Sequence, residues 1–126
     1  MNVVKASDAF SGFSVNDLDA AKKFYGETLG LALEEIPAGL MLKIGNGILV
    51  YPKPNHEAAT YTVLNFRVED IDQAVSDLNS KGIVFEHYQG LTDTKGVARG
   101  ISHNRGPDIA WFKDPAGNII SVLQEG

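Results

Sequence analysis

The sequence predicts an α+β fold made of two tandem βαβββ modules. Its 126 residues, 44% of them hydrophobic and 21% charged, are typical of a single globular domain. An internal repeat supports the two modules, because residues 13–21 align with residues 66–74 at an offset of 53, with five of nine positions identical. In both segments an alternating strand pattern passes directly into a helical one. We place module one at about residues 6–53 and module two at about residues 60–124.

Each module is expected to begin with a half-buried strand and a capped helix. In the first strand of each module, apolar residues such as Phe13 and Phe66 alternate with polar ones. Asp17 can cap the first helix, and Asp70 with Gln73 three residues later has the layout of a capping box. The apolar helix positions are Leu18, Ala21, Phe24 or Tyr25, and Leu29 before Gly30, then Ile71, Ala74, Val75 and Leu78 before Gly82.

Short apolar runs broken by glycine or proline follow each helix and are predicted to be strands. Turns are expected at residues 45–47 and 114–118, and a linker between the modules at residues 52–59. A glycine-rich stretch at residues 91–107 is the one insertion that interrupts the symmetry. The predicted strands are residues 31–36, 40–44 and 48–52 in module one, and 83–88, 109–113 and 119–123 in module two.

Composition excludes several functional classes. The 11 basic and 16 acidic residues give a formal charge of −5, which disfavours binding to nucleic acid or to an anionic membrane. The absence of cysteine excludes disulfides and thiolate metal sites, and three histidines leave little material for an imidazole-rich site. Since neither a signal peptide nor an apolar run of about 18 residues is found, we expect a soluble, cytoplasmic protein.

The two motifs at residues 17–31 (D-x-x-x-A-x-x-F-Y-x-x-x-L-G-L) and 114–118 (D-P-x-G-N) lie within paired βαβββ modules. In this combination the sequence resembles the glyoxalase / bleomycin resistance protein / extradiol dioxygenase group, the vicinal oxygen chelate superfamily. The resemblance covers almost the whole chain. It implies two curved mixed sheets that enclose a shared cleft, and it implies a homodimer, because many relatives dimerise.

The resemblance also implies where a divalent metal would bind. Metal-dependent relatives usually carry a His, Gln or Glu seven residues before the strand-ending Asp of each module, and a Glu or His on each final strand. The matching positions here are Phe10, Val63, Leu49 and Ser121. Because three are apolar and one is a neutral hydroxyl, we expect no metal cofactor in the usual place.

Strand alternation predicts which side chains line the cleft, since the opposite faces are covered by the helices. A mostly apolar lining with a few polar groups is typical of a pocket for a small organic molecule. Arg67 could bind a carboxylate or phosphate, or pair with an acidic residue at a module or dimer interface. Trp111 could stack on an aromatic ligand or pack in the core. The predicted ligand-binding residues are Phe10, Ser14, Leu49, Tyr51, Val63, Asn65, Arg67, Trp111 and Ser121.

The leading functional hypothesis is metal-independent binding of a small organic molecule, as in bleomycin resistance proteins. The stretch at residues 91–107 either covers the site or forms a solvated hairpin. It carries His103, the one candidate we consider for acid–base catalysis, whereas His56 and His87 are expected at the surface. The alternatives are a lyase, isomerase or dioxygenase of the same group, with a displaced metal site or metal-free chemistry at His103, and a structural or partner-binding dimer.

Overall fold

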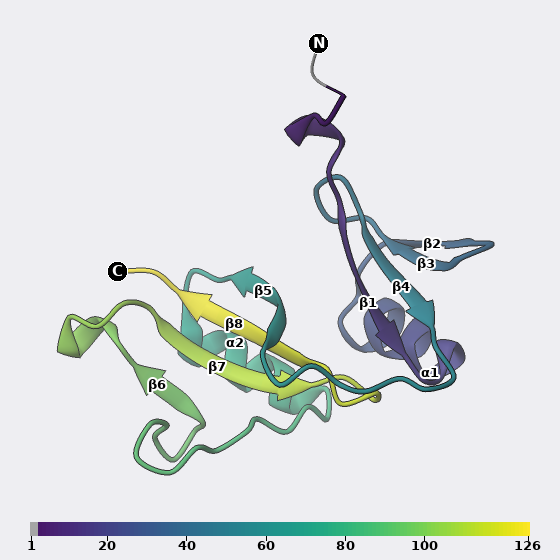
Figure 1. Ribbon diagram of the computed structural model, residues 1–126. Helices are drawn as coiled ribbons and strands as arrows, with labels where there is room; N and C mark the ends of the chain where they lie inside the picture. The colour runs from purple at the N-terminus through teal and green to yellow at the C-terminus, as the bar shows by residue number, and fades with distance from the viewer. Residues whose placement is uncertain (1–2) are drawn as a thin grey trace. The chain divides into compact units, whose positions relative to one another are not determined.

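The computed structural model describes residues 3–126 of the chain (Figure 1). Contacts divide the chain after Ala58 into two compact units, which are described separately here. Each unit contains one four-stranded mixed sheet and one main helix, so each has the βαβββ order expected from the repeat. No helix within residues 3–126 has both the length and the apolar character needed to cross a bilayer.

The first unit has strand order β1-β4-β3-β2. Strand β1 pairs with β4 in parallel, whereas β4, β3 and β2 pair in antiparallel fashion. Its buried core includes Phe13 and Val15 of β1 and Tyr25 of the helix. The elements are the 3-10 turn η1 (Ala6–Asp8), β1 (Ser11–Val15), α1 (Leu18–Lys22), the π-helical turn η2 (Lys23–Thr28), β2 (Leu33–Ile36), β3 (Gly39–Leu42) and β4 (Ile48–Pro52).

The second unit repeats this order, with strands β5-β8-β7-β6. Strand β5 pairs with β8 in parallel, and helix α2 packs against β7 and β8 (Figure 1). Its buried core includes Val75 of α2, Phe112 of β7 and Ile120 of β8. The elements are β5 (Thr62–Arg67), α2 (Ile71–Ser80), β6 (Val97–Arg99), the 3-10 turn η3 (Ile101–His103), β7 (Asp108–Lys113) and β8 (Ile119–Gln124).

The acidic caps predicted at the helix starts are present in both units. The side chain of Asp17 accepts a hydrogen bond from the backbone of Ala20, and that of Asp70 accepts one from the backbone of Gln73. The reciprocal half of the predicted capping box is absent, because the Gln73 amide donates to Asp77 one turn further along. Gly30 and Gly82, which follow the helices, have the positive φ values of 70° and 88° that favour glycine.

The prediction of a strand at residues 83–88 is wrong. Ile83 and Phe85 are buried and Val84 is exposed, so the alternation is real, but it reflects packing of an extended segment and not a strand ladder. A single backbone hydrogen bond, from Glu86 to Trp111, joins this segment to β7. The fourth strand of the sheet is β6, which lies within the stretch predicted to be an insertion and pairs with β7.

Candidate functional site

The face of the second sheet that lies opposite α2 holds several of the predicted ligand-binding residues. We call it the open face. Trp111 of β7, Ser121 of β8 and Asn65 of β5 are register partners, so they form one row across the sheet. Ser121 is fully buried within this row and donates a hydrogen bond to Asn65 Oδ1. Phe112, the next residue of β7, points to the opposite side and is buried beside Phe85.

Trp111 therefore does not belong to the core between the sheet and α2. It is half-buried and its ring makes an edge-to-face contact with Tyr88, with ring centroids 5.6 Å apart. This contact fixes one edge of the indole and leaves part of its surface exposed to solvent. An aromatic surface of this kind can stack on a flat ligand.

Trp111 lines a pocket of about 480 Å³ that lies wholly within the second unit. Its apolar side is formed by Leu91, Pro107, Ile109 and Trp111, and charged side chains enter from the segment between α2 and β7. Small-molecule pockets usually measure about 300–1,000 Å³ and combine an apolar lining with a few polar groups. The acidic and basic residues lining this pocket are Asp93, Arg99, His103 and Arg105.

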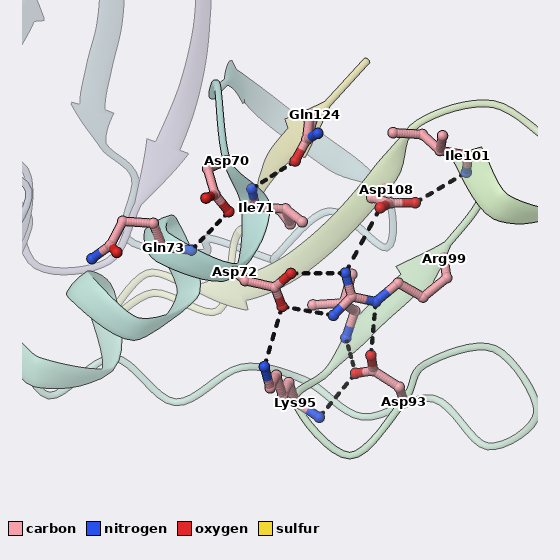
Figure 2. Close-up of polar contacts among 11 residues, drawn as sticks. Asp70, Ile71, Asp72, Gln73, Asp93, Lys95, Arg99, Ile101, Asp108 and Gln124 are labelled. Atoms are coloured by element: carbon pink, nitrogen blue, oxygen red, sulfur yellow. Dashed lines mark hydrogen bonds and ion pairs between the residues drawn. The ribbon is translucent and has the colours of Figure 1, made fainter. Parts of the chain in front are cut away.

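Arg99 of β6 links the segment between α2 and β7, which lines the pocket, to α2 (Figure 2). Its guanidinium forms a bidentate pair with Asp72 of α2, with nitrogen–oxygen distances of 2.7 and 3.1 Å, and its Nε donates to Asp93 at 2.9 Å. Asp108 contributes a third carboxylate at 3.7 Å. Lys95 adds a second cation to Asp72, at 3.3 Å.

These contacts set the protonation states of the cluster. The Arg99 hydrogen bonds lower the pKa of Asp72 to about 2, against a smaller opposing effect of desolvation. For Asp93, burial favours the neutral form, but hydrogen bonds from the backbone of Val97 and from Arg99 outweigh it and lower the pKa. Hydrogen bonds to Asp72 and Asp93 raise the pKa of Arg99, so the cluster is ionised at neutral pH.

We expect Arg99→Met to lower the free energy of unfolding by about 1–2 kcal/mol at pH 6, a value reduced for solvent screening because Asp72 is 45% exposed. A carboxyl group with a lowered folded-state pKa stabilises the fold above its unfolded pKa. The loss should therefore shrink as pH falls from about 3.8 towards 2. Urea denaturation across this range measures it. Arg67→Met, which removes an exposed pair, is the control, and an equal loss in both variants would contradict this role of Arg99.

Arg67 lies on the open face but outside the pocket. Its side chain is 80% exposed and pairs with Glu125 of the same unit at 3.1 Å. Of the two kinds of partner considered for Arg67, the structure contains an acidic residue, Glu125, which belongs to the same unit. Val63 lies at a β-bulge between Thr62 and Leu64, which interrupts the register of β5.

In the first unit, the predicted ligand-binding residues lie on or next to β1 and β4. Ser14 and Tyr51 are register partners, and Leu49 pairs with Gly12 two residues earlier on each strand. Ser14 Oγ lies 2.7 Å from Nδ1 of His56, so His56 is a half-buried hydrogen-bonding residue and not a fully solvated one. Phe10 precedes β1 and is 58% exposed.

The residues at the family's metal positions do not fit a divalent cation. Phe10 and Leu49 in the first unit and Val63 in the second have no donor atom, and the Ser121 hydroxyl is bonded to Asn65. A hard divalent ion needs several oxygen or nitrogen ligands. Within residues 3–126 no three His, Asp or Glu side chains gather where they could hold a metal ion.

The pocket includes two of the residues singled out from sequence, Trp111 and His103. The sequence does not predict the lining contributed by Leu91 and Ile109. The features of residues 91–107 that indicate a binding segment are the glycine content and four basic side chains, Lys95, Arg99, His103 and Arg105. The alternation of β7 also places Ile109 two residues from Trp111, on the same face.

Comparison with known proteins identifies the group to which this fold belongs. The profile of the Glyoxalase/Bleomycin resistance protein/Dioxygenase superfamily matches residues 9–122. The chain belongs to this superfamily. No curated protein matches it.

Solved structures of the superfamily share the fold over almost their full lengths. A glyoxalase family protein from Bacillus anthracis superposes with a TM-score of 0.68 at 22% identity, covering 100% of this chain and 99% of that one. TnmS3, an antibiotic binding protein from Streptomyces sp. CB03234, gives 0.67 at 23% identity with full coverage of both chains. The fosfomycin resistance protein FosX from Listeria monocytogenes gives 0.65 at 12% identity, covering 92% and 90%.

Proposed function

We propose that this protein binds a flat, largely apolar organic molecule in the pocket beside Trp111, without a metal ion. The observation that carries the proposal is the position of Trp111, half-buried on the open face of the sheet and lining a pocket of about 480 Å³. Leu91, Pro107 and Ile109 supply apolar contacts around it. A pocket of this volume can hold a small organic molecule, such as one with two fused rings.

The donor atoms present support metal independence. The four positions that hold the ion in metal-dependent relatives offer one hydroxyl, already bonded to Asn65, and a divalent ion needs several oxygen or nitrogen ligands. One structural relative, TnmS3 from Streptomyces, is described as an antibiotic binding protein. Binding of an organic molecule by this chain is therefore in keeping with its superfamily.

Naphthalene probes test this proposal, because the chain has a single tryptophan and hence a single indole N–H resonance in the NMR spectrum. We expect 2-naphthoate or 2-naphthamide to shift that resonance and to bind equally well with EDTA present. Trp111→Leu should weaken binding measured by calorimetry about tenfold, since it removes an aromatic contact and buried area.

Tyr61→Leu provides the matched control. Tyr61 is an aromatic residue of the same unit, 70% exposed and outside the pocket, so its replacement should leave probe affinity unchanged. Binding that needs a divalent ion, or that Trp111→Leu leaves intact, would show that the proposed site is wrong.

A further inference from the structure

The pocket beside Trp111 contains two cationic arginines and a histidine but one carboxylate. Arg99 is already neutralised, because Asp72, Asp93 and Asp108 surround it. Within residues 3–126, no carboxylate oxygen lies within 4.0 Å of the side-chain nitrogens of Arg105 or His103. Arg105 thus carries a positive charge that no carboxylate of residues 3–126 within 4.0 Å neutralises, although the chain as a whole carries −5.

Backbone hydrogen bonds hold Arg105 and His103 in a defined turn, and both residues line the pocket. The carbonyl of Gly100 accepts hydrogen bonds from the backbone of His103 at 3.2 Å and of Arg105 at 2.9 Å. Asn104 between them is in the left-handed conformation, with φ of 55°, which asparagine tolerates better than most residues. His103 and Arg105 are the residues before and after Asn104, and both line the same pocket.

The chemistry of the two side chains suits an anion. An arginine presents a planar fork of N–H donors that matches a carboxylate or a phosphate, and either tautomer of histidine provides one N–H donor. The remaining arginine of the pocket cannot play this part, since its donors are used by Asp72 and Asp93. Trp111 and Ile109 offer apolar surface in the same pocket.

We infer that Arg105 and His103 bind the anionic group of the ligand, which is a flat apolar molecule bearing a carboxylate or a phosphate. This inference rests on the proposed function, because it takes the ring system to be bound beside Trp111. Beyond the proposed function, it specifies an anionic ligand and the two residues that select for the anionic group. The competing explanation is that both side chains are ordinary solvated surface cations.

Four probes of one ring system separate these explanations: 2-naphthoate, 2-naphthyl phosphate, neutral 2-naphthamide and cationic 2-naphthylmethylammonium. We expect at least one of the two anions to bind about tenfold more tightly than the amide, and the cation to bind most weakly. Arg105→Gln should remove most of the preference for the anion, because it should weaken binding of the anions much more than binding of the amide. His103→Gln should reduce the preference for the anion by a smaller factor than Arg105→Gln.

Lys81→Gln is the charge-matched control, because Lys81 is an exposed residue of the same unit outside the pocket. Unchanged melting temperatures would establish that the variants are folded. Equal affinity for the four probes, or equal effects of Arg105→Gln and Lys81→Gln, would overturn the inference while leaving binding at Trp111 intact. Failure of every probe to shift the indole resonance would overturn the proposed function and the inference together.

Discussion

Replacing Phe112 with alanine is expected to lower the free energy of unfolding by about 3–5 kcal/mol. Phe112 is fully buried between the second sheet and α2, and its ring makes an edge-to-face contact with Phe85 at 5.5 Å. Truncation removes this contact and leaves a cavity that the surrounding β-sheet cannot close. Chemical denaturation monitored by circular dichroism measures the loss.

The neighbouring residue provides a sharp control. Trp111 is larger than Phe112 but lies on the open face and is half-buried, so Trp111→Ala should cost only about 1–2 kcal/mol. It should, however, weaken binding of the naphthalene probes by at least about tenfold. If both substitutions destabilised the protein equally, Trp111 would be a core residue and the proposed pocket would lose its basis.

Asp114→Ala is expected to cost about 2–4 kcal/mol, because it leaves buried donors without acceptors. Asp114 is 5% exposed, and its carboxylate accepts hydrogen bonds from the backbone of Ala116 at 2.9 Å and of Asn118 at 2.8 Å. It also accepts one from the Asn118 side chain at 3.0 Å. These bonds stabilise the turn between β7 and β8, so loss of the Asp114 carboxylate should weaken the pairing between these two strands. Hydrogen exchange of the backbone amides of β7 and β8 measures the effect together with denaturation.

Asp77→Ala is the matched control for this second substitution. Asp77 also accepts a side-chain hydrogen bond, from Gln73, but both residues are exposed on α2, and the loss should stay within about 0.5 kcal/mol. If Asp114→Ala were as mild, the carboxylate would not stabilise the turn, and a functional reason for this acid would have to be sought.

The two motifs that connect the sequence to its superfamily are structural. Asp17 caps a helix, and Asp114 with Asn118 stabilises a turn. Their presence therefore reports on the fold and carries no information about the chemistry of the site. This explains why the superfamily could be recognised from sequence while the ligand could not.

Local patterns predicted the elements whose formation depends on neighbouring residues. The helix caps, the glycines after the helices and the strands around Phe13 and Phe66 all appear where expected. The segment at 83–88 failed because an alternating pattern marks burial on one side, and it does not determine whether the backbone pairs with another strand. Pairing with β7 is made instead by the short β6, which has only three residues and lies within a glycine-rich stretch.

By itself, the sequence determined the repeat, the α+β class and the absence of metal ligands at the expected positions, because each depends on residue type and spacing along the chain. Only the tertiary structure decided that Trp111 faces away from α2, and that Asp72, Asp93 and Asp108 neutralise Arg99 while Arg105 keeps its charge within the pocket. Asp72 and Arg99 are 27 residues apart, and no local pattern encodes their contact. Such a pairing exists only once α2 and β6 have been brought together, and it leaves Arg105 as the pocket arginine with no carboxylate within 4.0 Å among residues 3–126.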